Sequence, residues 1–158
     1  MRVLKIIDGT SVDGPGLRTS IYFAGCSHHC HGCHNPQSWD PASGEEVDIE
    51  TILGRIEEND FDVTFSGGDP LYQVEKLTEL AKRIKMCGRN IWCYTGYSFE
   101  EITNDPKLSA ILPYIDVLVD SKFNLDLRDI SLRFRGSSNQ RIIDVKKSKP
   151  GQIVLWQD

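Results

Sequence analysis

The chain has 158 residues, a length typical of one domain, and its 39% of apolar residues is ordinary for a globular protein. A net charge of −5 argues against nucleic-acid binding. The N-terminus lacks the apolar segment of a signal peptide, and no apolar run approaches the ~20 residues that a membrane helix needs. We therefore expect one domain over residues 1–158, located in the cytoplasm and binding neither nucleic acid nor membrane.

Two strands are predicted at the start of the chain. Residues 3–7 (VLKII) and 19–25 (TSIYFAG) are rich in the β-branched and aromatic side chains that strands prefer. The segment before the second strand, DGTSVDGPG (8–16), has the Gly, Asp and Pro content of a loop. We expect the two strands to pair across it.

Three cysteines follow the second strand. Cys26, Cys30 and Cys33 have the spacing C-x₃-C-x₂-C within GCSHHCHGCHN (25–35). In a cytosolic chain, clustered cysteines indicate metal binding or catalysis rather than a disulfide framework. Thiolates bind zinc and iron–sulfur clusters alike, so the spacing alone leaves both possibilities open. We expect His34, next to the last cysteine, to lie near the bound group. The other histidines of the loop are expected to be exposed without a role: His28, His29 and His31.

Helices and strands alternate through the rest of the chain. Asp48 is placed to cap one amphipathic helix, and Ser98 begins a capping box before another. Between them, an apolar face that ends at Gly88 predicts a third helix. The predicted strands are 61–66, 90–97 and 114–123, with weaker ones at 141–145 and 152–156.

This alternation predicts an α/β fold with a mostly parallel sheet. A complete (β/α)₈ barrel takes ~250 residues, so we expect an open partial (β/α) barrel. Ligands of such sheets bind where the strands end. Three unusual loops should therefore gather at one edge of the sheet: the cysteine loop, SGGDP (66–70) and TGY (95–97).

The SGGDP loop has features of a ligand site and of a simple turn. Gly67 and Gly68 would let a ligand approach the backbone, and Asp69 would offer a carboxylate to an amino group. A tight turn before a helix explains the same residues. Outside these loops, Cys87 and Cys93 are expected to be small core residues.

The charge is uneven along the chain. Residues 1–121 hold 10 Lys/Arg and 19 Asp/Glu, whereas residues 122–149 hold 8 Lys/Arg and 3 Asp. The basic stretch is either a docking surface for an acidic partner or an ordinary solvated face. Four arginines are the candidates for docking: Arg128, Arg133, Arg135 and Arg141.

Taken together, these motifs resemble a known family. The chain is similar to the radical S-adenosylmethionine activases, and most similar to the branch that activates anaerobic (class III) ribonucleoside-triphosphate reductases. Most of the superfamily has an aromatic residue at the position of Gly32, and the branch usually has Gly at the position of Ser121. The resemblance rests on these segments: DGPGLRT (13–19), GCSHHCHGCHN (25–35), FSGGDPL (65–71), WCYTGY (92–97), VLVDSKF (117–123) and RGSSNQRIIDV (135–145).

The resemblance implies a fold and a mechanism. The fold would be an open partial barrel of the radical S-adenosylmethionine type, in which the three cysteines ligate a 4Fe–4S cluster. S-adenosylmethionine would bind the open iron, with its methionine end against Gly67, Gly68 and Asp69 and its adenine end against Gly32 and His34. One electron from the cluster would then cleave it to a 5′-deoxyadenosyl radical. That radical would generate a glycyl radical on the reductase. A flavodoxin-type protein is the expected electron donor.

Two other functions remain open at this stage. One is the activase of another glycyl-radical enzyme, such as pyruvate formate-lyase. The other is a non-catalytic zinc-binding module. Anaerobically purified protein would be brown with about four irons if it is an activase of either kind, and colourless with about one zinc if it is the zinc-binding module.

Overall fold

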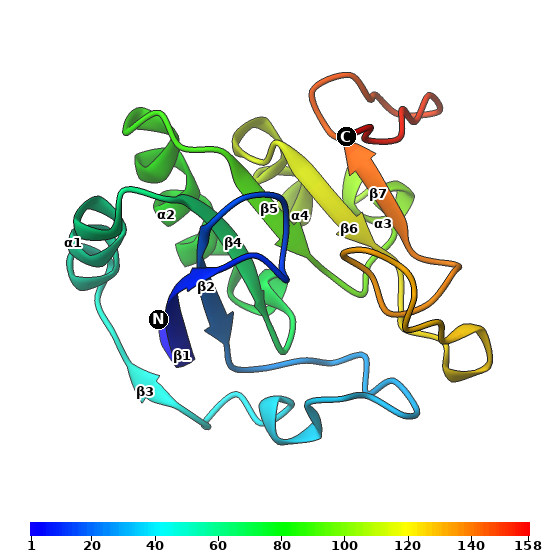
Figure 1. Ribbon diagram of the computed structural model, residues 1–158, viewed down its shortest axis with the longest axis horizontal. Helices are drawn as coiled ribbons and strands as arrows, with labels where there is room; N and C mark the ends of the chain where they lie inside the picture. The colour runs from blue at the N-terminus through cyan, green and yellow to red at the C-terminus, as the bar shows by residue number, and fades with distance from the viewer.

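The computed structural model describes residues 1–158 and contains one seven-stranded mixed sheet (Figure 1). Its spatial order is β3-β1-β2-β4-β5-β6-β7. The strands are β1 (Arg2–Thr10), β2 (Arg18–Phe23), β3 (Glu45–Glu46), β4 (Asp62–Gly67), β5 (Ile91–Tyr94), β6 (Val117–Asp120) and β7 (Arg141–Asp144). The helices are α1 (Ile49–Asn59), α2 (Val74–Met86), α3 (Phe99–Thr103) and α4 (Pro106–Ser109).

The four central strands are parallel and the outer ones are antiparallel. β2, β4, β5 and β6 run side by side in the same direction, as the βαβ pattern predicts. β1 pairs antiparallel with β2 and β3, and β7 pairs antiparallel with β6. The fold is therefore α/β with a mixed sheet. The sheet is open, because β3 and β7 are unpaired on their outer sides.

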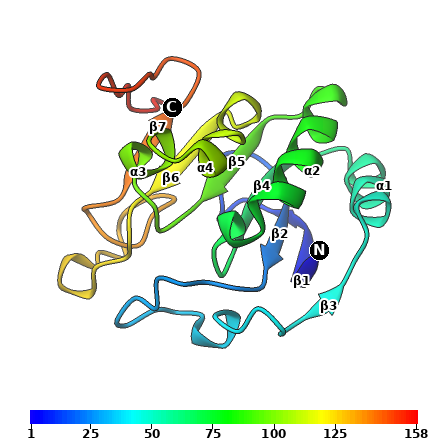
Figure 2. The ribbon, with the colours of Figure 1, turned by 180° about the vertical axis from the view of Figure 1, so that it is seen from behind.

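The helices cover only one face of the sheet. Figure 2 shows α1, α2, α3 and α4 in front of it, and Figure 1 shows the opposite face, which carries no helix. The main core lies between the helices and the sheet, and Phe23, Phe65 and Ile91 contribute to it from the strands. We call the other side the open face. It has a small aromatic cluster in which Trp92 packs edge-on against Phe134 and Trp156.

Local signals explain the helices. The Asp48 carboxylate accepts the Thr51 amide at 2.7 Å and caps α1, and Ser98 and Glu101 form the predicted capping box of α3. The apolar stripe of α2 is buried, and Gly88, in the left-handed region at φ 77°, follows its end.

A buried arginine holds the loop of residues 11–17 on the open face. Arg18 is 1% exposed and donates hydrogen bonds to Thr64 Oγ1 at 2.8 Å and to the carbonyl of Val63 at 2.9 Å. A Cβ at Gly14 would lie 2.8 Å from this side chain. Gly14 of the DGPG segment therefore has to lack a side chain for Arg18 to pack beneath the loop.

Two sequence expectations are wrong. Residues 152–156 do not form a strand. Gln152 and Leu155 make only isolated bridges, to Lys149 and Ile143, and Trp156 packs in the aromatic cluster on the open face. Cys87 is exposed rather than a core residue, because α2 ends there and the thiol turns outward. Cys93 is buried in β5, as expected. No helix is both long and apolar enough to cross a bilayer.

Candidate functional site

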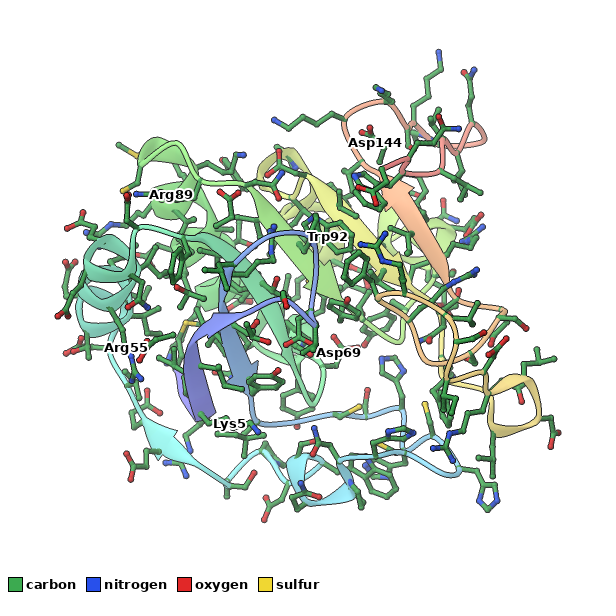
Figure 3. The ribbon with its side chains drawn as sticks, in the orientation of Figure 1. Lys5, Arg55, Asp69, Arg89, Trp92 and Asp144 are labelled. Atoms are coloured by element: carbon green, nitrogen blue, oxygen red, sulfur yellow. The ribbon has the colours of Figure 1, made fainter.

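The loops that follow β2, β4 and β5 meet at one edge of the sheet, as the sequence predicts. They enclose one side of a cavity of about 380 Å³. Cys26, Cys30 and Cys33 line it together with Gly67 and Gly68. Figure 3 labels Asp69 where β4 ends, at the margin of the open face. The loop after β6 and the 135–140 loop complete the wall.

The three thiols line the same cavity. All three are partly buried, and burial raises the pKa of the Cys26 and Cys30 thiols. No three Cys, His, Asp or Glu side chains gather closely enough to share a single metal ion. A cuboidal iron–sulfur cluster binds each thiolate at a different iron, so its ligands need not converge on one point. The residues fit such a cluster.

The cysteine loop is shaped by backbone turns. Gly25 and Gly32 have positive φ values of 98° and 76°, and the Cys33 amide donates to the Cys30 carbonyl at 3.1 Å. A Cβ at Gly32 would lie 2.9 Å from the Leu125 side chain, so an aromatic residue could not occupy this position without displacing it. Gly32 does not line the cavity. His34 does, with its ring edge-on to Phe123 at 5.4 Å.

The glycine pair is constrained by the protein itself. A Cβ at Gly67 would collide with the backbone of Phe23, and one at Gly68 would lie 2.5 Å from the carbonyl oxygen of Gly25. The Gly68 amide donates to the Phe23 carbonyl at 2.8 Å, and the Asp69 amide to that of Gly25. The pair therefore lets β4 lie directly against the end of β2, just before Cys26.

Asp69 is buried and accepts several hydrogen bonds. Its carboxylate accepts the Leu71 amide at 2.9 Å, the Gly96 amide at 3.0 Å and the Thr95 hydroxyl at 2.9 Å. His28 completes the set, with Nε2 at 2.6 Å from Asp69 Oδ2. His28 is thus not an exposed loop residue as the sequence suggests, since its side chain is only 6% exposed. His29 and His31 are exposed.

Two polar groups in the cavity wall have no protein partner. The indole N–H of Trp39 and the hydroxyl of Tyr94 are buried without a hydrogen bond, and both residues line the cavity. Buried donors of this kind normally have a partner, so a polar ligand fits the space between them. Sequence reasoning does not single out either residue, because only the fold brings Trp39 and Tyr94, which are far apart in the sequence, to the wall of one cavity.

The chain matches the sequence model of a family described as "4Fe-4S single cluster domain" over residues 12–143. It is 38% identical to the anaerobic ribonucleoside-triphosphate reductase-activating protein of Haemophilus influenzae over 152 residues, 90% of this chain and 97% of that protein. The chain belongs to the family of anaerobic ribonucleoside-triphosphate reductase-activating proteins.

Other members of the reductase-activating family are also similar over most of the chain. The protein of Escherichia coli K12 is 40% identical over 82% of this chain and 89% of its own length. That of enterobacteria phage T4 is 34% identical over 83% and 86%. Family membership supports an iron–sulfur cluster as the bound group, which the cysteine spacing alone leaves undecided against zinc.

Proposed function

We propose that this chain activates an anaerobic ribonucleoside-triphosphate reductase by forming a glycyl radical on it through reductive cleavage of S-adenosylmethionine. The observation that carries the proposal is a shared cavity. Three partly buried thiols and the backbone of the Gly67–Gly68 pair line the same space of about 380 Å³. Relatives named as activating proteins of that reductase supply the partner class.

Cys26, Cys30 and Cys33 would hold the 4Fe–4S cluster, and binding would release protons because thiolates are the ligands. When bound and reduced, the cluster would supply the one electron needed to cleave the sulfonium of S-adenosylmethionine to methionine and a 5′-deoxyadenosyl radical, the species that would take a hydrogen atom from the partner's glycine. In the proposal a flavodoxin-type protein delivers the electron.

The chain's own residues would bind and orient the substrate. In the proposal Gly67 and Gly68 offer backbone to the methionine end. Asp69 is buried and its oxygens accept protein hydrogen bonds, so it would act on the ammonium through its negative charge rather than by direct contact. His34 would serve the adenine end, and the unpartnered N–H of Trp39, which lines the same cavity, would be a donor to the substrate.

The surroundings of the cavity would give the partner access. A groove of about 620 Å³ adjoins it and shares Gly96, Ser121 and Phe123 with its wall. A sheet that is open and lacks helices on one face leaves room for a segment of a second protein.

The decisive test is anaerobic incubation of the reconstituted protein with a reductant, S-adenosylmethionine and the reductase. Electron paramagnetic resonance (EPR) should detect a glycyl radical on the reductase. Iron and zinc analysis separates the proposal from a zinc module, and replacing the reductase by pyruvate formate-lyase separates it from the other activase. A radical on pyruvate formate-lyase alone would refute the proposed partner.

Substitutions test the ligands. Cys26→Ala, Cys30→Ala and Cys33→Ala should each abolish cleavage of S-adenosylmethionine, because each thiol supplies one ligand and the loop has no spare. Cys87→Ala and Cys93→Ala should leave the iron content unchanged, since one thiol is exposed on α2 and the other is in the core. Loss of iron from a folded Cys87 or Cys93 variant would contradict the assignment.

A further inference from the structure

We propose that His28 is a positioning residue that fastens the cysteine loop to the loops after β4 and β5. This proposal rests on the proposed function, because it concerns how the loop is held for its cluster. His28 lies between two of the three cysteines, Cys26 and Cys30, so any constraint on its side chain limits the directions of both thiols.

The contacts of His28 are those of a fixed side chain. Its Nε2 lies 2.6 Å from Asp69 Oδ2, and both side chains are nearly inaccessible, with exposed fractions of 6% and 3%. Its ring packs edge-on against Tyr97, with the ring centres 4.5 Å apart. A hydrogen bond between two buried polar side chains is costly to break, because each is left without a partner.

The carboxylate that receives His28 is itself immobile. Asp69 accepts backbone amides of Leu71 and Gly96 and the hydroxyl of Thr95, so its position is set by β4 and β5 before His28 is considered. His28 therefore joins the loops that follow three parallel strands: β2, β4 and β5.

A second observation comes from Gly96 in the TGY segment. A Cβ there would lie 2.5 Å from Cδ2 and 2.8 Å from Nε2 of the His28 ring. Gly96 is not among the glycines with positive φ, so its backbone conformation does not require glycine. The imidazole ring is what excludes a side chain, and the loop after β5 is shaped around it.

Removing this contact should separate cluster binding from substrate binding. Three thiols remain in His28→Ala, so the cluster still assembles. The cysteine loop is then no longer held against the loop that carries Gly67 and Gly68. Losing one hydrogen bond to a charged group in a buried setting corresponds to about tenfold or more in an equilibrium constant. We expect His28→Ala to weaken S-adenosylmethionine binding by about tenfold or more.

The experiment compares four anaerobically reconstituted proteins: the wild type, His28→Ala, His28→Phe and His31→Ala. His28→Phe keeps a ring against Tyr97 but lacks the hydrogen bond. His31 is an exposed histidine of the same loop and serves as the matched control. Iron content, S-adenosylmethionine affinity and the change that S-adenosylmethionine causes in the EPR spectrum of the reduced cluster are measured. Both His28 variants should retain iron but show weaker binding and a diminished spectral change, while His31→Ala matches the wild type.

Gly96→Ala provides a second arm. Alone, it should weaken binding about as much as His28→Ala, because its methyl group displaces the ring. In the double variant with His28→Ala it should add no further loss, since the ring is gone. Additive losses would overturn the steric part of the proposal.

A third arm does not depend on the cluster. In metal-free protein, peptide-resolved labelling gives the rates at which Cys26 and Cys30 react with a thiol reagent, with exposed Cys87 as internal reference. His28→Ala should accelerate both by about tenfold, the factor that corresponds to losing one buried hydrogen bond to a charged group. Unchanged rates would overturn the proposal, even if the wild type forms its cluster. Faster rates in a protein whose wild type binds no cluster would uphold the contact and refute the proposed function instead.

Discussion

Ser121 is a residue whose strain is visible in the structure. It has a φ of 77°, a left-handed conformation that non-glycine residues adopt at a cost of about 1–2 kcal/mol. Its amide donates to the Tyr97 carbonyl at 2.9 Å, and its hydroxyl donates to Asp120 at 3.1 Å. The activase branch that this chain resembles usually has glycine at this position. The positive φ gives the physical reason, because glycine adopts it without strain.

The strain at Ser121 can be measured with two variants. Ser121→Gly and Ser121→Ala both lose the hydroxyl, but only the glycine variant relieves the backbone. Ser121→Gly should therefore be more stable than Ser121→Ala by about 1 kcal/mol in chemical denaturation of the metal-free protein. Equal stabilities would mean that this turn tolerates a side chain without strain.

At the scale of elements, the contact between the ends of β2 and β4 is the tightest part of the site. A methyl group at Gly68 would meet the Gly25 carbonyl oxygen at 2.5 Å and that of Ser38 at 2.9 Å. Gly68→Ala should therefore destabilise the metal-free protein by about 1–3 kcal/mol, the usual cost of overpacking. Gly54→Ala is the matched control, since nothing lies within 4 Å of its Cβ position in α1.

The two glycines should respond in opposite directions. Gly54→Ala should be stabilising by roughly 0.5–1 kcal/mol, because alanine favours the helix interior. If Gly68→Ala is as stable as the wild type and weakens only S-adenosylmethionine binding, the glycine serves the ligand alone. Gly68→Val, with a larger side chain, would then be expected to spare the fold as well.

Elements with local signals could be predicted from the sequence, and contacts made by the fold could not. The caps at Asp48 and Ser98 and the apolar stripes fixed α1, α2 and α3, and the parallel order brought three motif loops to one edge. The burial of His28 was missed because its partner is 41 residues away. The tail after β7 was misassigned because aromatic packing on the open face decides its path.

At the scale of the whole molecule, the four arginines of the basic stretch (122–149) differ in their contacts. Two make hydrogen bonds that hold the fold together, and two lie exposed on the surface. Arg141 bonds Asp120, which is fully buried, at 2.5 Å and Glu100 at 2.7 Å, so it ties β7 to β6 and α3. Arg135 donates to the carbonyls of Ser138 and Gln140 within its own loop. Both arginines are therefore engaged within the protein.

The remaining two arginines are the better candidates for docking. Arg128 is exposed, and exposed Arg133 is paired only with Asp158 at 2.7 Å on the surface, a type of ion pair that contributes little. The double variant Arg128→Ala/Arg133→Ala should slow activation of the reductase by about three- to tenfold at low salt, because charges near an interface mainly accelerate association. Cleavage of S-adenosylmethionine without the reductase should be unchanged.

Salt gives the signature of that effect. The difference between the double variant and the wild type should shrink at high ionic strength, where screening shortens the ~8 Å Debye length. Lys76→Ala/Lys82→Ala removes two exposed positive charges from α2, on the covered face of the sheet, and should behave like the wild type. An equal slowing in this control would assign the effect to net charge rather than to docking.

The positions of the tryptophans have an optical consequence. The chain has three, and Trp39 alone lines the cysteine cavity, stacked on His29 with ring centres 4.4 Å apart. Trp92 and Trp156 contact each other on the open face, with ring centres 5.0 Å apart. Fluorescence from Trp39 therefore reports the state of the cysteine loop, while the emission of the other two reports the docking of the C-terminal tail. Trp39→Phe separates the two signals, so loop and tail can be followed independently in one solution.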